Sequence, residues 1–180
     1  MKIAYTMMPG RGDMDRLLAA LADDLLVAGY CVRGVVQSNQ ERPGDHPCDM
    51  DIKVLPAGAE LRISQALGKG SRGCRLDPSI LQKAALSVER SLATGADLLL
   101  INKYGKNEAQ GRGFYDAIAQ AVAMDVPVLC GLNSLNFEAF MSFTDRQAFE
   151  LKPDIGSLKT WVVGAVTAQT MASDQAAFFG

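Results

Sequence analysis

The sequence has no apolar run of membrane-spanning length and no leader pattern at its start. The aliphatic run at residues 98–101 is short, whereas a helix needs about 20 apolar residues to cross a bilayer. The chain reaches Pro9 and Gly10 after only a few apolar side chains, so it lacks the apolar segment of a signal peptide. We therefore expect no membrane insertion and a cytoplasmic protein.

Cysteine is scarce, and its four positions do not form a pattern. Cys31 and Cys130 lie in apolar, strand-like runs. Cys48 and Cys74 lie in polar turns, so the spacing matches neither a disulfide framework nor paired zinc knuckles. We expect all four thiols to be reduced.

An excess of charge of one sign is also lacking. The chain has 18 Lys and Arg residues against 20 Asp and Glu residues. Nucleic acids and anionic membranes are attracted by a broad basic surface, so this near balance predicts neither as a partner. Any anion-binding site must therefore be local.

Strand-like and helix-like stretches alternate along the chain, which is typical of an α/β domain. Such alternation favours a mostly parallel sheet covered by helices on both faces. The 48% hydrophobic composition suffices for one substantial core, and no repeat or linker interrupts it. We expect one three-layer domain over residues 1–180, with strands near 2–6, 31–36, 98–101 and 127–131, a surface loop over 37–50 and a small hairpin over 52–64.

Turn and capping residues mark the expected helix ends. Asp13 is expected to cap a first helix that stops at Gly29. Asp77 and Pro78 predict the start of a second helix, because a carboxylate caps well and proline fits the first helical position. Apolar spacing predicts further helices over residues 114–122 and from residue 157.

The glycine-rich turn after the first strand is the first candidate anion site. Backbone N–H groups of such a turn, together with a helix N-terminus, bind phosphate in many proteins. A Walker A loop also needs a lysine and a Ser or Thr, but Asp13, Met14 and Asp15 occupy this region. The alternative is a tight turn with an acidic helix start. Arg11 and Gly12 remain candidate anion contacts.

The polar loop after residues 98–101 is the second candidate. Ligands of open α/β sheets bind outside the carboxyl ends of the strands, and this loop should lie there. Lys103 and Lys106 would attract an anion near Asn102, and Arg112 would orient it with paired donors. Glu108 is a hydrogen-bond acceptor and a weaker candidate for a general base. The alternative is a solvated loop.

Residues 62–75 form a third, basic segment. Arg62, Lys69, Arg72 and Arg75 have no acidic residue between them, and the glycines of this segment would let the backbone approach a ligand closely. Lys69 and Arg72 are therefore candidate contacts in a second wall of the site. The alternative is a basic loop that contacts the chain's own acids or a second subunit.

Metal-ligand residue types are present, but their spacing is not that of a metal site. One histidine and no repeated ligand pair make a solvated loop the expected structure. Cys74 is also a possible nucleophile, because Arg72 and Arg75 would favour its thiolate, although no histidine stands beside it. We expect no metal site; the residues concerned are His46, Cys48, Asp49, Asp51 and Cys74.

A series of phrases spans most of the chain: the opening glycine turn with DRLLAALADDL, the strand ending at Gln37, ISQALG, GCRLDP, NKYGKNEAQGRGF and PVLCGLN. Together they resemble an uncharacterised bacterial family classed as nucleoside-triphosphatase-like. The resemblance implies a relative of the small P-loop nucleoside triphosphatases, whose central strand ends in an Asp and Glu pair that organises magnesium and water. Asn102 and Lys103 replace that pair, which implies weakened or lost hydrolysis.

The sequence therefore predicts a P-loop-like α/β domain that binds a small anionic or phosphorylated ligand, with weak or absent hydrolysis. Nucleotides, with or without magnesium, belong to this ligand class. Two alternatives stay open. One is an active nucleoside triphosphatase or phosphotransferase that uses Glu108, and the other is a regulatory or assembly protein without catalysis, such as a homodimer.

Overall fold

The computed structural model describes residues 2–10, 12–40, 49–65 and 76–178. The strands are β1 (Ile3–Met7), β2 (Val32–Gln40), β3 (Asp49–Leu55), β4 (Glu60–Arg62), β5 (Leu98–Tyr104), β6 (Val128–Leu132) and β7 (Phe149–Leu151). The helices are α1 (Asp13–Val27), α2 (Pro78–Leu92), α3 (Lys106–Ala109), α4 (Tyr115–Ala123), α5 (Phe137–Phe143) and α6 (Ile155–Phe178), with a 3-10 turn at Ser134–Asn136.

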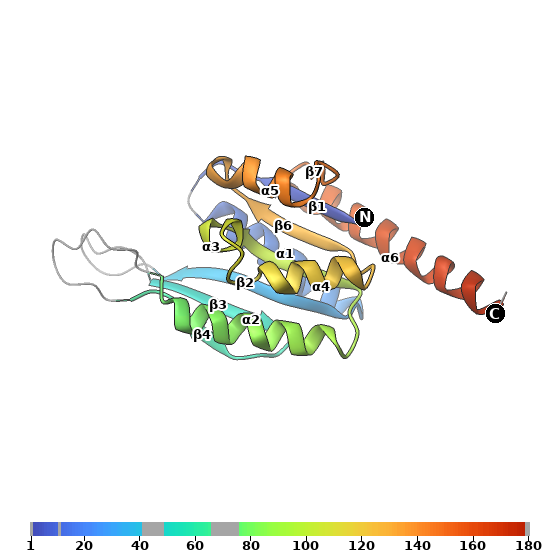
Figure 1. Cartoon of the computed structure of the whole chain (residues 1–180), viewed down its shortest axis with the longest axis horizontal. Helices are drawn as coiled ribbons and strands as arrows, with labels where there is room; N and C mark the ends of the chain where they lie inside the picture. The colour runs from blue at the N-terminus through green and yellow to red at the C-terminus, as the bar shows by residue number, and fades with distance from the viewer. Residues whose placement is uncertain (1, 11, 41–48, 66–75, 179–180) are drawn as a thin grey trace.

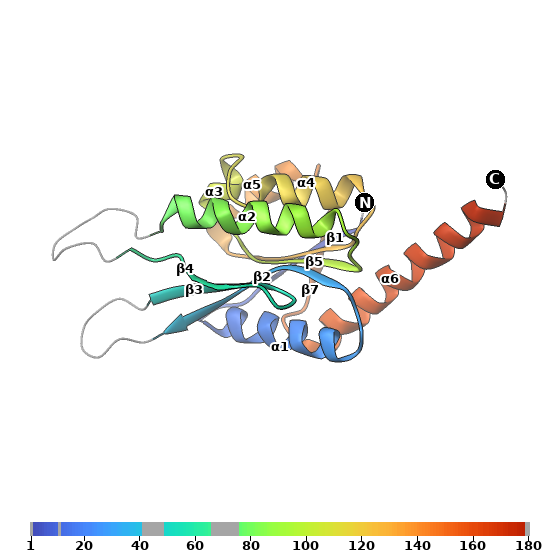
Figure 2. The same cartoon turned by 90° about the horizontal axis from the view of Figure 1, so that it is seen from below.

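The described strands form one seven-stranded sheet between two layers of helices (Figure 1). Its order is β4-β3-β2-β5-β6-β1-β7. Neighbouring strands from β2 to β7 in this order are parallel, whereas β3 and β4 run antiparallel at one edge. Helices α1 and α6 cover one face, and α2 to α5 cover the other (Figure 2). The predicted three-layer architecture with a mostly parallel sheet is confirmed.

The central strand β5 is buried on both faces. Leu99 and Ile101 pack in the core on the side of α2 and α4. Leu98 and Leu100 pack in the second core, on the side of α1 and α6. Because side chains of a strand alternate between the faces, a strand covered by helices on both sides requires a continuous apolar run. The run at residues 98–101 meets this requirement.

The start of α2 agrees with the capping prediction. The Asp77 carboxylate accepts hydrogen bonds from the backbone N–H groups of Ser79 (2.9 Å) and Ile80 (3.3 Å), and Pro78 is the first helical residue. The predicted cap of α1 is wrong. Gly12, in a left-handed conformation, precedes the helix without a side-chain cap, and Asp13 is already helical.

The predicted hairpin is confirmed as the antiparallel pair β3 and β4. The loop expected over residues 37–50 is wrong for residues 37–40 and 49–50, because β2 continues to Gln40, β3 begins at Asp49, and these two strand ends pair. The sequence patterns also missed α3, α5 and β7, which are too short for a clear periodicity. Among the described helices, none has both the length and the hydropathy of a bilayer-spanning segment.

Gly34 in β2 is required by the close approach of β5. Its φ is +117°, and a Cβ at this position would lie 2.0 Å from the backbone oxygen of Leu100. Gly29 also has a positive φ, +87°, but a Cβ there would meet no atom within 4 Å. We expect Gly34→Ala to lower the free energy of unfolding by about 3–5 kcal/mol, and Gly29→Ala by about 1–2 kcal/mol from backbone strain alone. Urea denaturation measures both changes, and equal losses would contradict the steric role of Gly34.

Candidate functional site

A cavity of about 360 Å³ lies at the carboxyl ends of β2 and β5. The loop that carries α3 forms one wall, and α2 and the segment after β4 contribute to the others. The apolar lining residues are Val35, Ile63, Leu76, Leu81 and Phe114. The polar lining residues are Gln37, Asn102, Lys103, Lys106, Asn107, Glu108, Gln110 and Arg112, together with Gly105. The structure thus brings the second predicted loop to the wall of a cavity at the expected edge of the sheet.

Lys103 forms an ion pair with Asp15 of the first turn of α1. Its Nζ lies 3.1 Å from Asp15 Oδ1 and donates a hydrogen bond to Oδ2 at 3.3 Å. The Asp15 side chain is only 4% exposed, whereas that of Lys103 is 42% exposed. The buried Asp15 carboxylate is therefore paired with a lysine that is partly exposed in the wall of the cavity.

Two amides of β2 extend this ion pair into a polar chain. Asn39 donates a hydrogen bond to Asp15 Oδ2, and Gln37 donates to Asn39 Oδ1 at 2.9 Å. Gln37 and Lys103 both line the cavity, so the chain begins and ends at its wall. Gly12, at the turn after β1, lies beside Asn39: a Cβ on Gly12 would be 3.8 Å from Asn39 Nδ2. The first and second predicted segments therefore meet at this edge.

The end of β5 is irregular and incompletely hydrogen-bonded. Lys103 has a φ of +154°, which is rare for residues other than glycine, and the pairing of β5 with β6 shifts between Ile101 and Tyr104. Asn102 is buried, yet neither its Nδ2 nor its Oδ1 has a hydrogen-bond partner among the described residues. Unsatisfied buried groups and unusual backbone conformations cost free energy and concentrate at functional sites.

Glu108 holds the loop around α3 closed. Its Oε2 accepts the backbone N–H of Gly105 at 2.9 Å, and its Oε1 accepts that of Phe114 at 3.1 Å. Burial raises the pKa of this carboxyl above its usual value, although both hydrogen bonds act in the opposite direction. The group predicted as a general base thus has both oxygens engaged by the backbone of its own loop.

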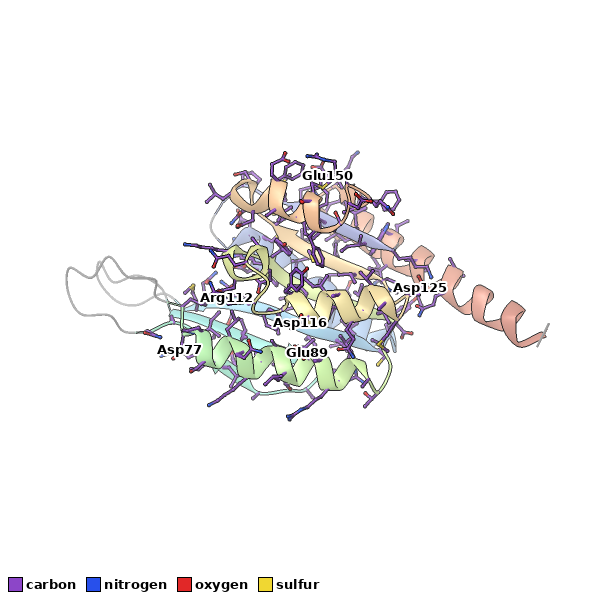
Figure 3. All side chains as sticks on the ribbon, in the orientation of Figure 1. Asp77, Glu89, Arg112, Asp116, Asp125 and Glu150 are labelled. Atoms are coloured by element: carbon purple, nitrogen blue, oxygen red, sulfur yellow. The ribbon has the colours of Figure 1, made fainter. Side chains whose placement is uncertain are left out.

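Lys106 and Arg112 are exposed at the cavity. Arg112 extends from the segment between α3 and α4 and donates a hydrogen bond to the Gln110 side chain (Figure 3). In the part of the chain that the structure describes, neither cation forms an ion pair with a carboxylate. Both are therefore available to an anion in the cavity.

The other predicted site residues are only partly placed. Arg11, Lys69 and Arg72 lie outside the described residues, and so do His46, Cys48 and Cys74. Arg62 pairs with Asp51 across the hairpin, with Nε 3.0 Å from Oδ1. Within the described ranges, no group of three His, Cys, Asp or Glu side chains is arranged to hold a metal ion.

The sequence did not predict the contacts of Asn39 and Asp15. The sequence places Asp15 at an acidic helix start, where a Walker A loop would have other residues, and gives no signal that it pairs with a residue of β5. Its partner Lys103 is 88 positions away along the chain. Gln37 was recognised as a strand end but not as a lining residue, and no sequence signal predicted that it faces the cavity.

The sheet order and the glycine turn between β1 and α1 make this a three-layer α/β domain whose fold is similar to that of a nucleoside triphosphatase. The solved structure of a human cancer-related nucleoside triphosphatase has a similar fold, with a TM-score of 0.60 over 93% of this chain and 97% of that chain, at 20% identity. The chain belongs to the family described as protein of unknown function DUF2478, whose model matches residues 3–161. The resemblance inferred from the sequence is confirmed.

A second comparison concerns a longer protein. The chain is 38% identical over 143 residues to the molybdenum import ATP-binding protein ModC 2 of Bradyrhizobium diazoefficiens. The match covers 79% of this chain but only 16% of that protein. The chain thus corresponds to about a sixth of the relative.

Loss of the Lys103 cation should destabilise the fold. Lys103→Ala would leave the Asp15 carboxylate buried without its counter-charge, and we expect the free energy of unfolding to fall by about 2 kcal/mol, between the values typical of buried and exposed pairs. Asp15→Asn in the same chain should recover much of this loss. Lys159→Ala is the matched control, because Lys159 pairs with Asp24 of α1 where both side chains are largely exposed. Equal effects of the two lysine variants in urea denaturation would contradict this role of Asp15.

Glu108 should give stability a specific pH dependence. Its folded-state pKa is raised above the usual 4.5, so the folded state holds the proton more tightly than the unfolded state. The stabilising contribution is therefore complete below pH 4.5 and is lost as the pH rises through the folded-state pKa. Relative to Glu108→Gln, the wild type should lose stability over this window in urea denaturation. Glu138→Gln removes an exposed carboxylate and controls for the loss of one charge. If the difference in unfolding free energy between the wild type and Glu108→Gln does not change with pH, the burial of Glu108 does not shift its pKa and the prediction is wrong.

Proposed function

We propose that this domain binds a small phosphorylated ligand in the cavity beside α3, with weak or absent hydrolysis. One observation carries the proposal: Lys103, Lys106 and Arg112 line the same cavity at the carboxyl ends of parallel strands. This edge is the usual ligand position in open α/β sheets. Arginine and lysine supply the charge-assisted donors that bind phosphate oxygens.

Among the described residues, the carboxylates near the cavity are not arranged for metal-dependent hydrolysis. P-loop enzymes position a nucleotide with a lysine of the glycine turn and with magnesium held by side-chain oxygens. In this chain Asp13 pairs with Arg16, and Asp15 is engaged by Lys103 and Asn39. Glu108 is bound by two backbone N–H groups. These contacts support ligand binding that does not depend on magnesium.

Among phosphorylated ligands, the comparisons with known proteins favour nucleotides. The longer relative is an ATP-binding protein by name, and the structural neighbour is a nucleoside triphosphatase by title. We carry over only the ligand class, because the chain matches a sixth of the first protein and shares 20% identity with the second. Molybdenum import is a property of the longer protein.

A hydrolase that uses Glu108 is the enzymatic alternative. The raised pKa of this buried carboxyl, which lines the cavity, is the observation that favours it. Release of inorganic phosphate by the wild type, together with its loss in Glu108→Gln at unchanged ligand affinity, would support hydrolysis.

The assembly alternative is favoured by α6, which extends beyond the sheet (Figures 1 and 2). Light scattering on the purified chain would test the predicted homodimer.

Binding should be visible as a rise in melting temperature, because a ligand that binds only the native state stabilises it. We expect a shift with nucleotides in the presence of EDTA, and a loss of affinity of roughly five- to tenfold in Lys106→Ala and in Arg112→Ala. Lys83→Ala, at an exposed lysine of α2 that does not line the cavity, should leave affinity unchanged. Absence of any shift across a panel of nucleotides and oxyanions would refute the proposed function.

A further inference from the structure

Glu108 joins the two ends of the loop around α3. Its Oε2 accepts a hydrogen bond from the backbone N–H of Gly105 (2.9 Å), and its Oε1 accepts one from that of Phe114 (3.1 Å). We call these two hydrogen bonds the Glu108 clasp. Lys106 and Arg112, which both line the cavity, lie in the segment that the clasp closes. The clasp therefore fixes the base of the loop from which both cations extend.

The backbone inside the clasp folds back on itself. The N–H of Arg112 donates to the carbonyl oxygen of Asn107 at 2.9 Å, and the N–H of Gly111 donates to the carbonyl oxygen of Glu108 at 3.0 Å. Arg112 thus returns to the residue that follows Lys106. The two cations stand on one short turn, and their separation depends on the turn keeping its shape.

The glycines near the end of the loop differ in how they relate to the clasp. Gly113 has a φ of +61°, and a Cβ at this position would collide with Oε1 of Glu108. Gly111 has a similar φ, +70°, but a Cβ there would meet no atom within 4 Å. Both positions favour glycine by backbone conformation, and only Gly113 must lack a side chain for the clasp to form.

The charge of Glu108 opposes the binding of an anion. A buried carboxylate that lines the cavity repels a second negative charge there. Its geometric effect acts in the opposite direction, because a loop that is already held in its binding conformation loses less conformational freedom when the ligand binds. The charge and the geometry of Glu108 therefore predict effects of opposite sign on anion affinity.

We propose that Glu108 is a positioning residue of the anion site, whose clasp preorganises Lys106 and Arg112 for the phosphorylated ligand. The inference rests on the proposed function. It gives Glu108 a role in ligand binding that differs from that of a general base. Glu108 acts through the backbone of its loop and does not need to touch the ligand.

Two substitutions open the clasp in different ways. Glu108→Gln removes the charge and leaves one acceptor oxygen for two backbone N–H groups. Gly113→Ala keeps the charge and displaces Oε1, since the added methyl group would occupy its position. If Glu108 acted only through its charge, Glu108→Gln would raise anion affinity and Gly113→Ala would leave it unchanged.

Isothermal titration calorimetry in EDTA, with ATP, ADP, AMP, inorganic phosphate and pyrophosphate as probes, measures the affinities. We expect both clasp variants to weaken the tightest-binding probe on the order of tenfold. Gly111→Ala is the matched control, because it introduces the same methyl group at a similar φ in the same loop without touching the clasp. Its affinity should stay at the wild-type value.

A double-mutant cycle distinguishes positioning from a general loss of stability. Arg112→Ala should weaken binding less in the Gly113→Ala chain than in the wild type, because the arginine is no longer held at the ligand. Purely structural damage would leave the two effects additive. Trypsin cleavage after Lys106 and Arg112, located by mass spectrometry, should be several-fold faster in both clasp variants than in Gly111→Ala. Urea denaturation establishes that each variant is folded.

The outcomes separate this inference from the proposed function. If none of the probes binds the wild type, both fail. If a probe binds but Glu108→Gln raises its affinity, or if both clasp variants keep the wild-type affinity, the positioning role is wrong and the binding function stands. Unchanged affinity together with lost phosphate release in Glu108→Gln would assign this residue to the hydrolase alternative. An equal loss of affinity in Gly111→Ala would show that any strain in the loop suffices, which also overturns the inference.

Discussion

The ion pair between Asp15 and Lys103 connects the first helix to the end of the central strand. A carboxylate buried in this way requires a partner, because an unpaired charge in the interior costs several kcal/mol. Lys103 supplies the cation from β5 and remains partly exposed at the cavity. Three features therefore depend on one another: the position of α1, the amide side chains of β2, and the lysine and arginine side chains that line the cavity. Substitutions in this group should change stability and ligand affinity together.

The same ion pair lies at the edge of the sheet where ligands of open α/β folds bind. In the P-loop relatives that the sequence resembles, the central strand ends in acids and the glycine turn carries a lysine. In this chain Lys103 is the penultimate residue of β5 and Asp15 stands in the first turn of the helix, so the signs of charge are exchanged. The sheet order needs only the apolar core and the helix layers, so it tolerates this exchange. The cavity lies at the edge position typical of α/β ligand sites.

Much of the fold was predictable because its signals are local. Asp77 and Pro78 define the start of α2, and the run at 98–101 defines a buried strand. The prediction failed where pairing with a distant segment determined the secondary structure. Residues 37–40 are polar, yet they continue β2 because β3 pairs with them. For the site, the sequence indicated the loop of Lys103, Lys106 and Arg112, but it gave no indication that the backbone binds both oxygens of Glu108.

The sequence by itself determined the layers of helices and strands, since apolar periodicity, capping residues and turns act over a few positions. It also determined which segments carry positive charge at strand ends. Only the tertiary structure decided that Asp15 meets Lys103 and that Asn102 is buried without a partner. It also decided that Gln37 faces the cavity. These features depend on contacts between segments far apart in the chain, whose distances are set by the packing of the whole sheet against its helices.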